Sequence, residues 1–193
     1  LAQVLPKHLS PERQARIAAL PKPRESGAPW FDFEQAIAFL KRLDCDEEQV
    51  RGGTMDLPRL DFCLRSIEPH LPPGPLMGFH VGNFVGVSLA FFTAALLEHD
   101  SRSLMVAIDP NLTHRGVRDP LHHVIGLLNR FHLEDYVLPM TGYSLERSVS
   151  NDGIVFAGYD PQVEAEREQS CGHQLEGLAR LAPARFDFGL IDG

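Results

Sequence analysis

The sequence predicts an α/β fold whose sheet is mainly parallel. Segments with helical periodicity, at residues 87–98 and 121–131, alternate with short apolar runs. Strands that alternate with helices at this spacing indicate βαβ units and therefore a parallel sheet. Four apolar runs have the length of buried strands: residues 76–81, 103–108, 136–139 and 186–191.

Composition and charge narrow the class of protein. The chain has 193 residues, of which 44% are hydrophobic, as expected for one globular domain. Acidic residues outnumber basic ones 26 to 18, which argues against a nucleic-acid-binding surface. The longest apolar stretch, residues 81–97, is too short and too polar to span a membrane, and residues 1–10 do not resemble a signal peptide. We therefore expect a cytoplasmic protein without nucleic-acid or membrane partners, and we leave a homo-oligomer open.

The first part of the chain predicts helices without strands. Residues 1–29 are rich in proline and are expected to form a short helix and a linker. Apolar residues at helical spacing predict helices over 32–43 and 56–71, and Arg-Gly-Gly-Thr at 51–54 predicts a loop between them. We assign residues 1–54 to an N-terminal helical segment and linker, and residues 55–193 to the main domain.

The last part of the chain is longer than a simple strand connection requires. Between residues 148 and 184 we expect an extra strand or hairpin at 153–159 and a helix at 164–181. The sequence ends directly after the fourth apolar run. We therefore expect this chain to be part of a longer protein, with further strands beyond it.

The first predicted strand runs into a glycine-rich turn and then directly into a helix. The turn reads Gly-x-x-x-Gly-x-Ser, from Gly82 through Gly86 to Ser88. Ligands of open α/β sheets bind outside the carboxyl ends of the strands, and glycines there let a ligand approach bare backbone. Free N–H groups at the start of the next helix can bind a carboxylate. The same glycines could instead serve close packing of strand and helix.

The second predicted strand ends in Asp109, followed by Pro110. A carboxylate at this position can accept hydrogen bonds from the hydroxyls of a ribose. It can equally form a turn before the proline. Together with the glycine turn, Asp109 indicates a nucleoside-containing ligand. The dinucleotide fingerprint Gly-x-Gly-x-x-Gly has its middle glycine where this chain has Phe84, and only Gly82 and Gly86 match, at a wider spacing, which disfavours NAD.

These motifs resemble those of class I S-adenosylmethionine-dependent methyltransferases, in the small-molecule O-methyltransferase-like branch that includes sugar and macrolide methyltransferases. The resemblance covers residues 55–193. It rests on four motifs, at residues 81–88, 108–110, 142–144 and 186–193. It implies a Rossmann-like three-layer αβα sandwich with a mainly parallel sheet. It also implies methyl transfer from S-adenosylmethionine to a small hydroxylated acceptor.

The resemblance also implies roles for individual residues. Asp109 is expected to hold the ribose. Asp192 is expected to face the transferred methyl group as the catalytic residue and, in members that use a metal, to bind Mg²⁺. The other residues expected to contact the cofactor are His80, Gly82, Asn83, Phe84, Gly86 and Ser88 near the methionine part, and Gly142, Tyr143 and Ser144 near the adenine.

Two departures from the family motifs keep alternatives open. His80 and Tyr143 stand where the family has acids, so the chain could instead be a binding or scaffolding protein without catalysis. An NAD-dependent oxidoreductase is a second alternative, which the glycine spacing disfavours. His80 itself is open to three interpretations: cofactor contact, general base or packing.

Overall fold

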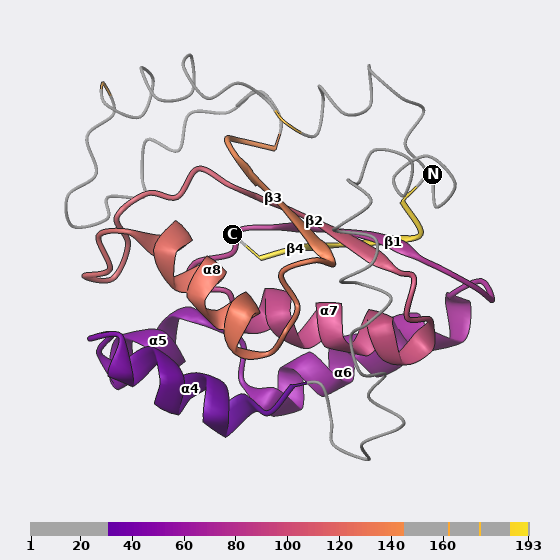
Figure 1. Cartoon of the computed structure of the whole chain (residues 1–193), viewed down its shortest axis with the longest axis horizontal. Coiled ribbons are helices and arrows are strands. Elements are labelled where there is room, and N and C mark those ends of the chain that lie inside the picture. The colour runs from indigo at the N-terminus through magenta and orange to yellow at the C-terminus, as the bar shows by residue number, and fades with distance from the viewer. Residues whose placement is uncertain (1–30, 145–161, 163–173, 175–185, 193) are drawn as a thin grey trace.

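The computed structural model describes residues 31–144, 162, 174 and 186–192. Four strands form one sheet in the order β3-β2-β1-β4, and each neighbouring pair is parallel (Figure 1). The predicted α/β class and parallel sheet are therefore confirmed. The strands are β1 (Met77–Val81), β2 (Leu104–Asp109), β3 (Val137–Thr141) and β4 (Phe188–Ile191).

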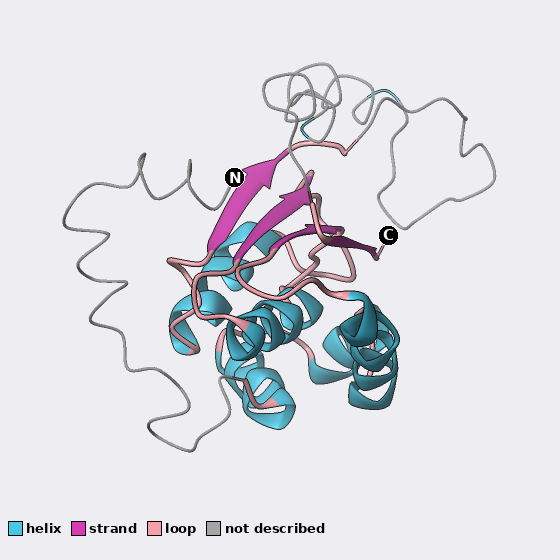
Figure 2. Cartoon of the chain, turned by 90° about the vertical axis from the view of Figure 1, so that its right-hand side faces the viewer, coloured by secondary structure: helices cyan, strands magenta, loops and turns pink. Residues whose placement is uncertain are grey.

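The described helices all lie on one face of this sheet (Figure 2). On the opposite face, Met77, Val106 and Ile108 form a second, smaller apolar cluster with neighbouring strand side chains. A three-layer sandwich needs a cover on that face as well and stays a prediction. The helices are α4 (Phe33–Arg42), α5 (Glu47–Gly53), α6 (Leu57–Ile67), the 3-10 turn η1 (Glu68–His70), α7 (Val87–His99) and α8 (Pro120–Arg130).

Most predicted elements agree with these bounds to within about two residues. The exception is the loop predicted at 51–54, which is wrong because most of it belongs to α5. Its two glycines are typical of loops and made the sequence misleading. The helix is supported by the Asp46 cap at its start and by the burial of Val50 on its inner face. Apart from Gln162 and Gln174, which are helical, the elements predicted within 1–29 and 148–184 lie outside the described residues.

Aspartate caps begin four of the helices. In each case a side-chain oxygen accepts a hydrogen bond from the backbone N–H three residues later, which satisfies one of the free donors of the first turn. Helix α7 differs, because Gly86 stands at its N-cap and no side chain caps it. The capping residues are Asp32 of α4, Asp46 of α5, Asp56 of α6 and Asp119 of α8.

Helix α7 is the centre of the main core. Nine of its 13 residues are buried, because it contacts β2 as well as α4, α6 and α8. A helix that is apolar all round is suited to such a position. Side chains from both sides of the predicted boundary at residue 54 share this core, among them Leu40, Val50 and Leu60. No described helix is long and apolar enough to cross a membrane.

The order of the strands indicates where a ligand is expected to bind. The chain passes from β1 to β2 and β3 on one side and then returns to add β4 on the other side of β1. In open α/β sheets, ligands bind beyond the carboxyl ends of the strands where the order reverses in this way. The residues that follow β1 and β4 are therefore the first place to look for a site.

Gly86 is the residue that lets the turn after β1 pack against α8. Its φ is +90°, and an added Cβ would lie 3.3 Å from the backbone Cα of Val124. We expect Gly86→Ala to lower the free energy of unfolding by about 2–4 kcal/mol, from left-handed strain plus overpacking. Urea denaturation measures this loss.

Gly74 is a matched control for this substitution. Its φ is +94°, but no atom lies within 4 Å of an added Cβ. Gly74→Ala should therefore show the strain alone, about 1–2 kcal/mol. Equal losses in the two variants would contradict the packing role of Gly86.

Candidate functional site

The turn after β1 is held in an unusual backbone conformation. Gly82 and Gly86 have φ values of +80° and +90°, and Phe84 between them has +48°. The N–H of Gly82 donates to the backbone oxygen of Ile108 at 3.0 Å, and that of Gly86 donates to the oxygen of Asn83 at 2.7 Å. Only glycine adopts such angles freely, which explains the two glycines at this spacing.

The carboxylate of Asp109 organises this turn. Its Oδ2 accepts hydrogen bonds from the backbone N–H groups of Asn83 and of Phe84, the latter at 3.3 Å. Its Oδ1 accepts from the N–H of Asn111 at 2.6 Å. Bonds to a charged acceptor are stronger than neutral ones, so Asp109 joins the turn to the loop after β2. Asp109 therefore has the turn-forming role, which was one of its two predicted roles, while ribose binding by Asp109 stays a prediction.

His80 lies beneath the turn and is completely buried. Its Nδ1 is 3.0 Å from the side-chain oxygen of Asn83, whereas its Nε2 is buried without a hydrogen-bond partner among the described residues. Burial lowers the pKa of His80 to about 4, and the bond to Asn83 opposes this only in part. A shielded ring of such low basicity favours packing over a role as general base.

The end of β4 meets the start of α7. The N–H of Asp192 donates to the backbone oxygen of Val81 at 2.8 Å, which continues the pairing of β4 with β1. The carboxylate of Asp192 then accepts a hydrogen bond from the Ser88 hydroxyl at 3.2 Å. Burial raises the pKa of Asp192, and the bond to Ser88 opposes the rise. The arrangement gives a half-buried carboxyl that can exchange a proton closer to neutral pH.

The predicted adenine segment lies beside Asp109. The N–H of Gly142 donates to the backbone oxygen of Asp109 at 3.0 Å, and the oxygen of Tyr143 accepts from the N–H of Gln174 at 2.7 Å. Ser144, the last residue of this segment, is half-buried. The predicted site residues thus lie at or beyond the carboxyl ends of β1, β2, β3 and β4, except His80, which lies within β1.

Sequence reasoning missed three polar residues at this edge. Asn111 donates from its side chain to the Thr141 hydroxyl at 2.9 Å, and Gln174 donates from its side chain to the Thr141 backbone oxygen at 3.1 Å. No motif marks these residues, because they are far apart in sequence and meet only in the folded chain, Asn111 and Thr141 through the pairing of β2 with β3.

Metal ligands are sparse at this edge. Within residues 31–144, 162, 174 and 186–192, no group of three His, Cys, Asp or Glu side chains is placed to hold a metal ion. The predicted Mg²⁺ ligand Asp192 has the Ser88 hydroxyl as its side-chain partner. The described residues therefore do not make a magnesium site by themselves.

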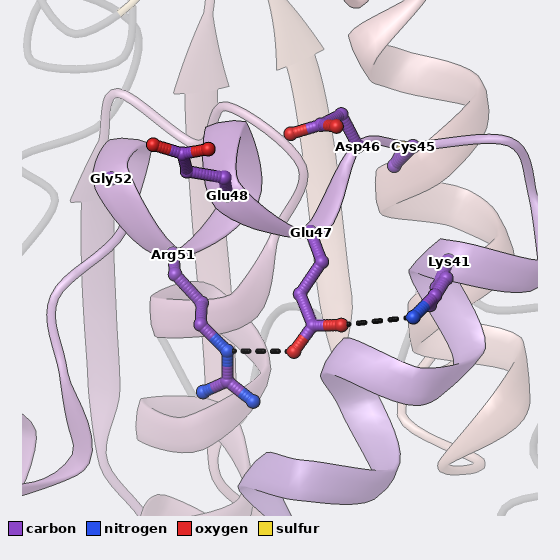
Figure 3. A pocket seen from close by; sticks show the side chains of 7 residues that line it. All are labelled: Lys41, Cys45, Asp46, Glu47, Glu48, Arg51 and Gly52. Atoms are coloured by element: carbon purple, nitrogen blue, oxygen red, sulfur yellow. Dashed lines mark hydrogen bonds and ion pairs between the residues drawn. The ribbon is translucent and has the colours of Figure 1, made fainter.

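A surface hollow of about 800 Å³ lies elsewhere, where α4 meets α5 (Figure 3). Three of its charged side chains pair: Glu47 lies 3.1 Å from Lys41 and 3.0 Å from Arg51. Exposed pairs of this kind contribute little free energy, and the buried side chain of the lining is the Cys45 thiol. Chemistry therefore favours the strand ends over this hollow as the functional site. Its lining residues are Lys41, Cys45, Asp46, Glu47, Glu48, Arg51 and Gly52.

Comparison with known proteins adds no family. No protein-family model matches the chain, and no curated protein matches it significantly.

The buried His80 should make stability depend on pH. Its folded pKa of about 4 lies below the ordinary value of 6.5, so the unfolded chain binds a proton that the folded chain does not. Stability should therefore fall as pH falls from 6.5 towards 4. Between pH 7 and pH 5, the wild type should lose about 2 kcal/mol more free energy of unfolding than His80→Gln.

Urea denaturation at the two pH values measures this difference. His70→Gln serves as the control, because His70 is exposed and its loss should leave the pH dependence unchanged. If the free energy of unfolding depended on pH equally in the wild type and in His80→Gln, the pKa of the buried ring would not be lowered by folding.

Proposed function

We propose that this chain is an S-adenosylmethionine-dependent methyltransferase domain acting on a hydroxyl group of a small acceptor. One observation carries the proposal: the glycine turn, Asp109, the segment beginning at Gly142, and Asp192 converge at the carboxyl ends of four neighbouring parallel strands. The order β3-β2-β1-β4 also agrees with the first four strands of a Rossmann-like sheet.

The start of α7 suits the carboxylate of the cofactor's methionine part. Gly86 leaves the first turn of α7 without a side-chain cap, whereas α4, α5, α6 and α8 each have an aspartate cap. The partial positive charge of a helix N-terminus attracts such a group. This free start supports the proposal because α7 directly follows β1, where the strand order reverses.

Asp109 retains the capacity to bind a ribose hydroxyl. Each carboxylate oxygen can accept two hydrogen bonds. Its Oδ2 already accepts from Asn83 and Phe84, but its Oδ1 accepts only from Asn111 among the described residues. One acceptor position on Asp109 thus remains for a ligand.

The chemistry assigned to the protein is modest. Bound S-adenosylmethionine supplies an electrophilic methyl group, and alignment of the acceptor oxygen with that carbon provides most of the acceleration. In this proposal Asp192 takes the proton from the acceptor hydroxyl, and the hydrogen bond from Ser88 orients its carboxylate. The raised pKa of Asp192 suits this exchange.

A non-catalytic binding protein is the second candidate function. The observation that favours it is the engagement of Asp109 with three backbone amides, which a purely structural turn would also need. His80 adds to it, because a neutral buried ring replaces the acid of the family motif.

Calorimetric titration of the chain with S-adenosylmethionine, and separately with NAD, distinguishes these functions. We expect micromolar affinity for S-adenosylmethionine and much weaker binding of NAD. Asp109→Asn should weaken binding at least tenfold, because it removes the charge and rearranges the turn. Repeating the titration with Mg²⁺ tests whether a metal contributes.

Asp187→Asn is the matched control. Its carboxylate also accepts one backbone hydrogen bond, from Met77 at 2.8 Å, but at the amino ends of β1 and β4. Its affinity should equal that of the wild type. Absence of binding to either nucleotide would move the non-catalytic function to first place, and preference for NAD would favour an oxidoreductase.

A further inference from the structure

The side chain of Asn111 bridges the ends of β2 and β3. Its Nδ2 donates to the backbone oxygen of Asp109 at 3.1 Å and to the hydroxyl oxygen of Thr141 at 2.9 Å. The same Asp109 oxygen accepts from the N–H of Gly142. Asn111 thus belongs to the network that fixes the turn and the predicted nucleoside edge.

These bonds fix which way the Asn111 amide faces. The backbone oxygen of Asp109 can only accept, so the amide nitrogen must face it. Both hydrogens of that nitrogen are then used, and the side-chain oxygen Oδ1 must point elsewhere. This oxygen is shielded from solvent and has no hydrogen-bond partner in the part of the chain that the structure describes.

The backbone of Asn111 is also specialised. Its φ is +56°, in the left-handed region that asparagine tolerates better than most residues. A buried acceptor without a donor costs free energy, and buried polar groups are nearly always hydrogen-bonded. A residue held at a left-handed angle, oriented by two bonds and left with one free acceptor calls for a donor from outside the chain.

We propose that Oδ1 of Asn111 accepts a hydrogen bond from an O–H or N–H group on the nucleoside part of the bound ligand. This inference rests on the proposed function for the identity of the ligand. It adds a binding residue beside Asp109, whose carboxylate is largely committed to the turn. Two groups of an adenosine carry suitable donors, the ribose hydroxyls and the 6-amino group of the purine.

Asn111→Gly is the informative substitution. Glycine keeps the left-handed backbone and removes the acceptor. In calorimetric titration with S-adenosylmethionine, we expect its affinity to fall about tenfold. Urea denaturation of each variant checks that the fold is retained.

Asn129→Ala provides the matched control. The Asn129 side chain also donates to a backbone oxygen, that of Ile125 at 2.8 Å, but on the exposed surface of α8. Its removal should leave the affinity unchanged.

Four probes identify the donor: adenosine, 2′-deoxyadenosine, 3′-deoxyadenosine and purine riboside, which lacks the 6-amino group. In the wild type, the probe without the relevant donor should bind about tenfold more weakly than adenosine. In Asn111→Gly that difference should disappear, because the partner oxygen is gone.

The outcomes separate this inference from the proposed function. Equal affinities of the wild type and Asn111→Gly for S-adenosylmethionine would overturn the role of Asn111 alone. Binding of NAD but not S-adenosylmethionine, lost in Asn111→Gly, would support Asn111 and overturn the methyltransferase. If the wild type bound none of S-adenosylmethionine, NAD and the four nucleosides, both the role of Asn111 and the methyltransferase function would be overturned.

Discussion

The carboxylate of Asp109 is the interaction on which the edge of the sheet depends. It binds the backbone of the turn after β1 through Asn83 and Phe84, and the loop after β2 through Asn111. The backbone oxygen of Asp109 binds Gly142 after β3. One residue thus fixes the ends of three strands relative to one another. Such a network is stable because each bond is made to a charged or fully oriented acceptor.

The position of α7 follows from this constraint. The turn leaves β1 at Gly82 and enters α7 at Val87, so the conformation of the turn decides where the helix starts. Helix α7 is buried against β2, α4, α6 and α8, which leaves little freedom for its N-terminus. The Ser88 hydroxyl, in the first turn of α7, in turn holds Asp192 at the end of β4. Packing of the core and geometry of the candidate site are therefore coupled.

The strands and most helices could be predicted because burial of one face of a helix, or of a whole short strand, leaves a characteristic spacing of apolar residues in the sequence. Helix α5 could not, since Gly52 and Gly53 are typical of loops and the burial of Val50, which favours the helix, depends on tertiary packing. For Asp109, sequence identified the residue but not its partners. A carboxylate at the tip of a strand can bind a ribose or a neighbouring amide, and only the course of the turn decides between them. The role of Asn111 could not be predicted either, because its partner Thr141 lies on another strand.

The rigidity of this edge determines which groups of the site are available to bind a ligand. Methyl transfer between small molecules demands alignment more than acid–base power, so a protein gains most by fixing its binding groups before the ligand arrives. Here the amides of Asn83 and Phe84 are satisfied by Asp109 and cannot serve the ligand. The ligand must then be bound by groups that the network orients but whose hydrogen-bonding capacity it leaves free. The uncapped start of α7, the Asp192 carboxyl and the free oxygen of Asn111 are such groups, and they follow three different strands of one sheet edge.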